Sequence, residues 1–218
     1  RGPTFDVACF RGTLATSAAG RALLASMTKQ LMEEIERNGW RDRWSQYVAD
    51  EPSINNVADY RILCGIIRRH MPGIPLNDAT DLNPSIAPGS VNAWCPKINV
   101  YQENLAEYEA ARKVGDQIWV YTCCYPGGNW LNRLLDMELI RPCLIGWSMD
   151  RFQVDGYLRW GLNAWRPNQP PFEQSYFMQA DGWALPAGDT HVFYPGPDGP
   201  WSSVRFEAER EGFEDLDL

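Results

Sequence analysis

The stretch WSQYVADEPSINNVADYRILCGIIRRHMPGIPLNDA, residues 44–79, decides the predicted fold class. Its opening reads as a short buried strand, which the pair Glu51-Pro52 breaks. Ser53 can cap the helix that follows, and a Pro-Gly pair ends this helix before a second strand at 74–79. The apolar residues that share one face of the helix are Val57, Tyr60, Cys64, Ile67 and Met71. The stretch therefore predicts a strand, a helix and another strand.

The same alternation continues on both sides of this stretch. An N-terminal strand is expected over 5–10, followed by a helix that Ser17 can cap. Six strands are predicted in all, beginning at Phe5, Trp44, Ile74, Val91, Gln117 and Gly156. Strands that alternate with helices at this spacing indicate parallel βαβ units.

The C-terminal part of the chain carries a helix, a loop and a second helix. The helical stretch over 131–152 is expected to restart at Pro142, because proline is tolerated only in a first turn. Beyond the last strand, a long Pro-rich loop is expected to run through Gly199, and Ser202 or Ser203 can cap a final charged helix.

Six parallel strands fit either an open doubly wound sheet or a barrel. The open sheet usually carries a Gly-rich phosphate loop, but Gly127-Gly128 is followed by Asn129, and no such motif is present. The residues able to do chemistry follow strands instead, where a barrel builds its active site. These residues are Asp50, Trp94, Tyr121 and Asn163. We therefore predict an α/β fold of the (β/α)8 TIM-barrel type, as a single domain over residues 1–218.

Composition argues against several classes of partner. The formal net charge of −8 leaves no basic surface for nucleic acid. No apolar run approaches the roughly 20 residues that cross a bilayer, so no membrane span is expected. The six cysteines and two histidines lack the spacing of a zinc site, and neither a metal nor another cofactor is expected. Adjacent Cys123 and Cys124 allow a strained vicinal disulfide, but two small buried residues at a strand end are the favoured interpretation.

Aromatic residues are unusually frequent, with ten tryptophans beside nine tyrosines and eight phenylalanines. Tryptophan presents a flat apolar face with a polar N–H at its edge, which suits the apolar face of a sugar ring flanked by hydroxyls. About half of the tryptophans are expected to be ordinary core or interface residues. The remainder favour a carbohydrate ligand.

Asp50 and Glu51 place two carboxylates at the carboxyl end of a predicted strand, just before a helix. Acidic residues beside a helix N-terminus are common for purely electrostatic reasons. Cleavage of a glycosidic bond, however, needs a carboxylic acid that protonates the leaving oxygen. The residues alone therefore leave two interpretations open, an electrostatic cap and a hydrolytic site.

Six segments, in order along nearly the whole chain, carry a resemblance to a known family. They are DEP (50–52), VNAWCP (91–96), WVYTCC (119–124), DGYLRWGLN (155–163), YPGPDG (194–199) and the tail RFEAEREGFED (205–215). Together they resemble the catalytic domain of glycoside hydrolase family 123, the β-N-acetylgalactosaminidases, and its close barrel relatives.

The resemblance implies a retaining hydrolase of terminal β-linked N-acetylhexosamine, above all N-acetylgalactosamine. In such an enzyme the substrate's own 2-acetamido oxygen is the nucleophile, so the resemblance makes Glu51 the acid/base and Asp50 the residue that orients the acetamido group. Pro52 is expected to hold Glu51 in an extended conformation and to favour a break in the strand. Such a break would let both neighbouring carboxylates face one substrate.

Aromatic and amide side chains at or beyond strand ends are candidate sugar contacts. Those predicted to line the pocket are Trp94, Tyr121, Trp160 and Asn163, and packing beneath the rim is the competing interpretation for each. Those predicted to shape its mouth from loops are Trp130, Trp165 and Trp183.

The chain departs from the family in one respect, because a full barrel has eight strands and the family usually carries an N-terminal β-sandwich. The barrel is therefore expected to be incomplete at its N-terminus, with about six of eight strands present. Unpaired edges tend to recruit another chain, so self-association is expected. The resemblance favours an extracellular or periplasmic location.

Two alternatives to this function remain. One is a carbohydrate-binding relative of the same barrel that has lost turnover. The other is a retaining hydrolase with a protein nucleophile, which requires a second carboxylate roughly 5 Å from Glu51.

Overall fold

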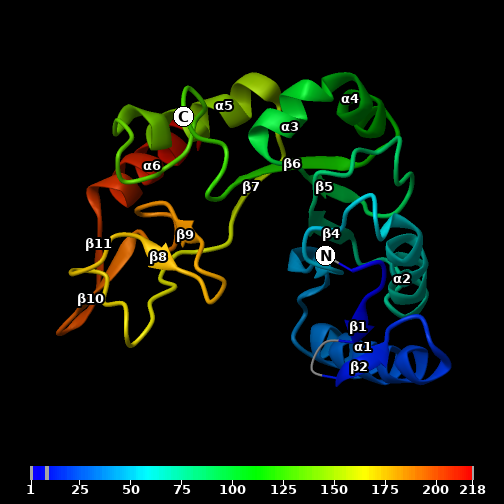
Figure 1. The fold of residues 1–218 in the computed structure, drawn as a ribbon. Coiled ribbons are helices and arrows are strands. Elements are labelled where there is room, and N and C mark those ends of the chain that lie inside the picture. Colours follow the sequence, from blue (N-terminus) through cyan, green and yellow to red (C-terminus); the bar gives the residue numbers. More distant parts are fainter. Residues whose placement is uncertain (1, 8–9, 218) are drawn as a thin grey trace. The chain divides into compact units, whose positions relative to one another are not determined.

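The computed structural model describes residues 2–7 and 10–217. The chain divides into two compact units, which Figure 1 shows in the blue-to-green and green-to-red parts of the ribbon. The first unit comprises Arg1–Pro96 and Val100–Trp119, and the second comprises Lys97–Asn99 and Val120–Leu218. The single domain expected over residues 1–218 stays a prediction.

Five of the six predicted strands form one sheet, in the order β3-β4-β5-β6-β7. The strands are β3 (Gln46–Tyr47), β4 (Leu76–Ala79), β5 (Ala93–Cys95), β6 (Gln117–Thr122) and β7 (Gly156–Arg159). The pairs β3/β4, β4/β5 and β5/β6 are parallel. The structure thus confirms an α/β fold with a parallel sheet, compatible with an incomplete barrel. Within the described residues the sheet has five strands, and closure by eight is not confirmed.

The predicted first strand, over 5–10, is wrong as a barrel strand. In its place β1 (Asp6–Val7) pairs antiparallel with β2 (Phe10–Leu14), and these two strands form a small sheet of their own. The Gly12 N–H donates to Asp6 Oδ2 at 2.9 Å, and Gly12 has a φ of 83°, which a side chain would make unfavourable. These two strands therefore form a local hairpin instead of joining the parallel sheet. Residues 8–9 of the predicted strand lie outside the described residues.

Two helices build the core of the first unit. As predicted, Ser17 caps α1 (Ala18–Arg37), since its side chain accepts the Gly20 N–H. Helix α2 (Val57–His70) connects β3 to β4 and buries its apolar face. The buried residues of α2 are Tyr60, Leu63, Cys64, Ile66 and Ile67. Between β5 and β6 lie α3 (Ile98–Glu103) and α4 (Leu105–Lys113).

The cap predicted for α2 at Ser53 is wrong, because residues 53–56 form a turn before the helix begins. The Ser53 N–H donates to Asn56 Oδ1 at 2.8 Å, and the Asn56 N–H donates to the Ser53 carbonyl oxygen at 3.0 Å. Asn56 then occupies the N-cap position, and the helix begins at Val57. The chain between the acidic pair and α2 is consequently fixed by its own hydrogen bonds.

The second unit packs α5 (Ile140–Phe152) against α6 (Val204–Glu214). Pro142 lies in the first turn of α5, as the sequence requires, but residues 131–139 are not helical. Asn132 explains the difference, because its side-chain amide donates to the carbonyl oxygens of Cys123 and Pro126. Such tertiary bonds hold the segment in an irregular conformation.

The segment predicted as one long Pro-rich loop contains two hairpins instead. Strand β8 (Phe177–Met178) pairs with β9 (Ala184–Leu185), and β10 (Phe193–Gly196) pairs with β11 (Gly199–Ser202), both antiparallel. Ser203 then caps α6 by accepting the Phe206 N–H, which settles the choice between Ser202 and Ser203.

Substitution of Gly212 by alanine should destabilise the second unit by about 3 kcal/mol or more, because overpacked contacts against backbone cannot relax. A Cβ at Gly212 of α6 would overlap the Cys143 carbonyl oxygen of α5. The measurement is the free energy of unfolding in urea. Gly65→Ala in α2, where a Cβ meets no atom within 4 Å, should instead stabilise by about 0.5–1 kcal/mol. Equal effects of the two variants would contradict this account of the α5/α6 contact.

Candidate active site

The acidic turn, residues 49–51, is separated from the end of β3 by one residue. Asp50 is exposed and Glu51 is partly exposed, so both carboxyl groups can reach a ligand. Glu51 has a φ of 48°, in the left-handed region that few residues other than glycine adopt. The expectation that Pro52 keeps Glu51 extended is therefore wrong. The strand does break at this point, but through a left-handed residue, a kind of strain that tends to occur at functional sites.

Asp78, in the buried strand β4, anchors the acidic turn from below. Its two carboxylate oxygens both lie 3.0 Å from the Ala49 nitrogen, whose N–H they accept. The Tyr60 hydroxyl of α2 donates to Asp78 Oδ2 at 2.8 Å. The Asp78 side chain is 0% exposed, so these bonds form away from water. The residue that precedes Asp50 is thus held by a buried carboxyl group.

Tyr47, the last residue of β3, links Asp50 to the same strand. Its hydroxyl donates to Asp50 Oδ1 at 3.2 Å and accepts the Ala79 N–H at 3.3 Å. Burial raises the pKa of Tyr47, and the negative charges of Asp78 and Asp50 raise it further. The phenol therefore stays protonated and remains a hydrogen-bond donor to Asp50.

The buried groups beneath the turn have strongly shifted proton affinities. Burial raises the pKa of Asp78 well above its ordinary value, and the charge of Asp50 adds to the rise. Hydrogen bonds from Tyr60 and Ala49 oppose this shift without cancelling it. Burial also raises the pKa of Tyr60, and so does the nearby Asp78. Perturbed carboxyl groups of this kind concentrate at functional sites.

A cavity of about 780 Å³ lies beside the turn in the first unit. Residues 46–50 contribute to its lining, which is otherwise mainly aliphatic. The aliphatic lining residues include Leu24, Met27, Leu31, Leu63 and Ile67. Such a lining offers few partners for sugar hydroxyls, so the cavity by itself is not a carbohydrate site.

Of the predicted sugar contacts, Trp94 is the one that lies in the first unit. Its side chain is fully buried, and its indole Nε1 donates to Asp116 Oδ2 at 2.9 Å. In the sheet Trp94 pairs with Asp78, so it belongs to the strand next to the anchor of the acidic turn. This buried placement agrees with the competing interpretation for Trp94, in which the side chain packs beneath the rim of the pocket.

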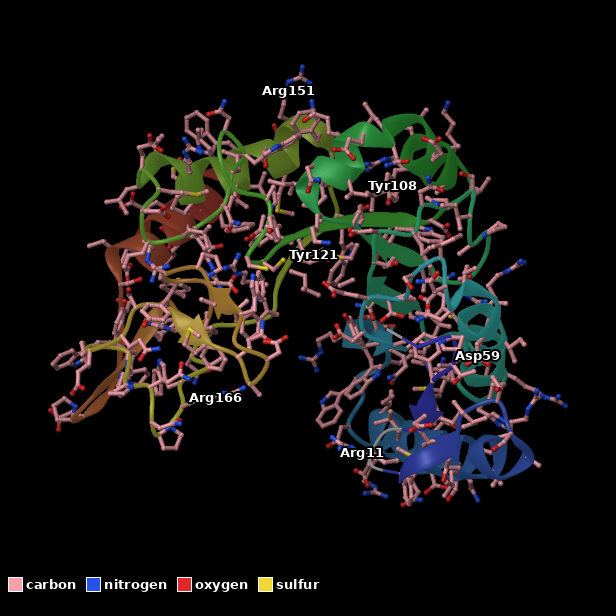
Figure 2. All side chains as sticks on the ribbon, viewed as in Figure 1. Arg11, Asp59, Tyr108, Tyr121, Arg151 and Arg166 are labelled. Atoms are coloured by element: carbon pink, nitrogen blue, oxygen red, sulfur yellow. The ribbon has the colours of Figure 1, made fainter. Side chains whose placement is uncertain are left out.

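Tyr121 lies in the second unit, in the part of β6 that follows Trp119, and is buried (Figure 2). The Lys97 ammonium lies 5.3 Å from the centre of its ring, within the range of a cation–π contact. Cys123 and Cys124 follow β6 as free thiols whose sulfur atoms lie 3.8 Å apart. A hydrogen bond from Cys124 lowers the pKa of Cys123 to about 7.

Three other predicted contacts share one segment of the second unit, residues 189–193. The Trp160 indole N–H approaches Asp189 Oδ1 at 3.4 Å, and Trp160 is 48% exposed. Asn163 pairs with His191 through a β-bridge, and the Trp165 indole N–H donates to the Phe193 carbonyl oxygen at 2.9 Å.

The remaining two loop tryptophans do not share this segment's contacts. Trp130 is partly exposed, and its carbonyl oxygen accepts from Arg141. Trp183 is exposed. All of these residues stay predictions as substrate contacts.

Sequence reasoning missed the supporting residues Tyr47, Tyr60 and Asp78, as well as Arg159. The Arg159 guanidinium forms a buried ion pair with Asp189 and also donates to Thr122 and Asn132. One available signal was the polar pair Asn77-Asp78 inside a strand that was expected to be buried, because an ionisable residue is rarely buried without a specific partner.

Two further properties concern the described part of the chain. Across residues 2–7 and 10–217, no three His, Cys, Asp or Glu side chains gather in a way that could hold a metal ion. In the same residues, no helix has the length and apolarity that a membrane span requires.

The acidic turn follows the carboxyl end of a strand in a parallel α/β sheet, which is where barrel enzymes of this fold class place their active sites. The glycoside hydrolase 123 catalytic-domain model matches residues 7–218, and the chain belongs to that family. A solved structure, described as a family 123 glycoside hydrolase from Clostridium perfringens, has a similar fold. The two share 18% sequence identity with a TM-score of 0.71. The match covers 92% of this chain and 35% of the other, so this chain spans about a third of that relative. A search of curated proteins found no match to this chain.

Proposed function

We propose that this chain carries the catalytic residues of a glycosidase that removes a terminal β-linked N-acetylhexosamine, above all N-acetylgalactosamine. The observation that carries the proposal is the acidic turn of a family 123 chain, in which Asp50 and Glu51 are presented beyond a strand end and anchored by Tyr47 and Asp78. The Clostridium perfringens relative is described by its hydrolysis of glycolipid glycans. A glycolipid glycan therefore belongs among the substrates to be tried.

In the proposed mechanism, Glu51 donates a proton to the leaving glycosidic oxygen while the 2-acetamido oxygen of the substrate attacks the anomeric carbon. The product of this step is a ring-closed oxazolinium intermediate and a free alcohol. Glu51 then takes a proton from water as the water oxygen opens the ring, so that the configuration at the anomeric carbon is retained. One carboxyl group serves in both steps.

Asp50 has a separate part in this mechanism. Its carboxylate would accept the acetamido N–H, orient the oxygen for attack and stabilise the positive charge that develops in the ring. Adjacent residues cannot flank both faces of one anomeric carbon, which favours an internal nucleophile over a carboxylate of the turn. Tyr47, through its bond to Asp50 Oδ1, would fix the carboxylate in this position.

Hydrolysis of chromogenic β-N-acetylgalactosaminide and β-N-acetylglucosaminide, measured beside binding to a glycan array, tests the proposal. Turnover of the first sugar at a higher kcat/KM than the second would support it. Glycan binding without turnover of either sugar would overturn it in favour of a carbohydrate-binding relative.

Tyr47→Phe should lower kcat about tenfold, because it removes one hydrogen bond to Asp50, worth about 1.4 kcal/mol in the transition state. KM should change little. Tyr101→Phe is the matched control, since Tyr101 also donates to a carboxylate, Glu109, in the same unit. Equal loss of kcat in the two variants would show that Tyr47 has no specific part in the site.

A further inference from the structure

We propose that Asp78 is a positioning residue of the active site, which fixes the acidic turn by accepting the Ala49 N–H on both of its carboxylate oxygens. This inference rests on the proposed function of Asp50 and Glu51, because it assigns Asp78 a part in their chemistry without contact to the substrate. The sheet register, the bonds from the two tyrosines and the burial of the carboxyl group each support it.

The sheet register shows why the turn needs such an anchor. The backbone ladder between β3 and β4 ends at the pair Tyr47 and Asn77. Beyond this pair the chain leaves the sheet, and the Ala49 N–H bonds to the Asp78 side chain. A side chain from β4 thus takes over at the point where backbone pairing stops. The next two residues are the proposed catalytic pair, so any movement of Ala49 moves both carboxylates.

Two tyrosines hold the anchor and the turn in one network. Tyr60, itself 0% exposed, donates to Asp78 Oδ2 and restrains that carboxyl group from the side of α2. Tyr47 bonds both to Asp50 and to the backbone of Ala79, the residue after Asp78. The network therefore reaches Asp50 along two routes, through the Ala49 backbone and through the Tyr47 hydroxyl. Positioning of this kind affects the rate more than the affinity.

A buried carboxylate with only tyrosine and backbone partners is unfavourable for folding. Burial raises the pKa of Asp78, so the folded protein holds its proton at pH values where the unfolded chain has released it. Stability contributed by this group is therefore lost as the pH rises from the ordinary pKa of Asp towards the raised value. An asparagine at this position, which stays neutral, should not lose stability in this way as the pH rises. The charged form of Asp78 thus lowers the stability of the fold. This is expected of a group that is retained to position the turn, and not of one that is retained for stability.

The decisive variant is Asp78→Asn in the protein as it is naturally made, measured for kcat, KM and Tm across pH. We expect kcat to fall roughly 10- to 100-fold with little change in KM, and Tm at neutral pH to equal or exceed that of the wild type. Asp59→Asn is the matched control. Asp59 lies on α2 and is labelled in Figure 2, and it accepts from Phe5 and Thr16 rather than from the acidic turn. The control should leave kcat within about twofold. A wild-type kcat in Asp78→Asn, or a drop in kcat explained by a lower Tm, would overturn the inference.

Hydrogen exchange separates failure of this inference from failure of the proposed function. The amide of Ala49 should exchange slowly in the wild type and at least about tenfold faster in Asp78→Ala, while the amides of α2 keep their rates. Unchanged exchange at Ala49 in a folded Asp78→Ala variant overturns the anchor whether or not the protein hydrolyses a sugar. Faster exchange at Ala49 in a protein that turns over no glycoside would support the anchor and reject the enzyme.

Discussion

Glu51→Gln should lower kcat on an unactivated β-N-acetylgalactosaminide by about 10²–10⁴-fold, because glutamine matches the shape of the acid but cannot deliver its proton. The fold should survive, since Glu51 is partly exposed and glutamine can adopt the same left-handed conformation at a similar cost. The measurement is the initial rate on a natural disaccharide, together with the Tm, for the wild type and for Glu51→Gln.

Activated aryl glycosides should hide part of this defect, because a good leaving group needs less protonation. A Glu103→Gln variant, with the same chemical change at an exposed residue at the end of α3, should keep the wild-type rate. Near-normal activity of Glu51→Gln on the unactivated sugar would remove Glu51 from the mechanism.

A sugar with a 2-hydroxyl in place of the 2-acetamido group should be hydrolysed at least about 10⁴-fold more slowly, because an internal nucleophile supplies an effective molarity of that order or greater. Asp50→Asn should lower kcat by about 10²–10³-fold on the N-acetyl sugar, since it weakens an interaction that is strongest in the transition state. KM should change far less than kcat. Both comparisons use the protein as it is naturally made.

A thiazoline mimic of the ring-closed intermediate provides an independent measurement. It should bind tightly to the wild type and more weakly to Asp50→Asn, since the carboxylate that meets the ring nitrogen is lost. Equal hydrolysis of the two sugars, or a sugar trapped covalently on a protein carboxylate, would rule out substrate assistance. The search would then turn to another acidic residue as nucleophile.

Much of the first unit and of the sheet could be predicted from local patterns. The alternation of short strand-like runs with amphipathic helices located all five strands of the sheet. The clearest signal came from β4 and β5, which are buried along their whole length. Ser17 was recognised as a cap, and Ser203 as one of two candidates, since a cap depends on residues within one turn. The predicted long helix over 131–152 failed where Asn132 makes bonds to residues six and nine positions away.

The sequence by itself determined the α/β class, the resemblance to family 123 and the position of Asp50 and Glu51 beyond a strand end. These features depend on residue order and on local periodicity, which a single chain displays directly. Only the tertiary structure decided that Glu51 is left-handed, that Trp94 is fully buried, and that Asp78 anchors the turn. The bonds of Asp78, for example, join residues that are 18 or more positions apart in the sequence. Such contacts are selected by packing and by the need to satisfy every buried polar group, and neither requirement leaves a periodic signal in the chain.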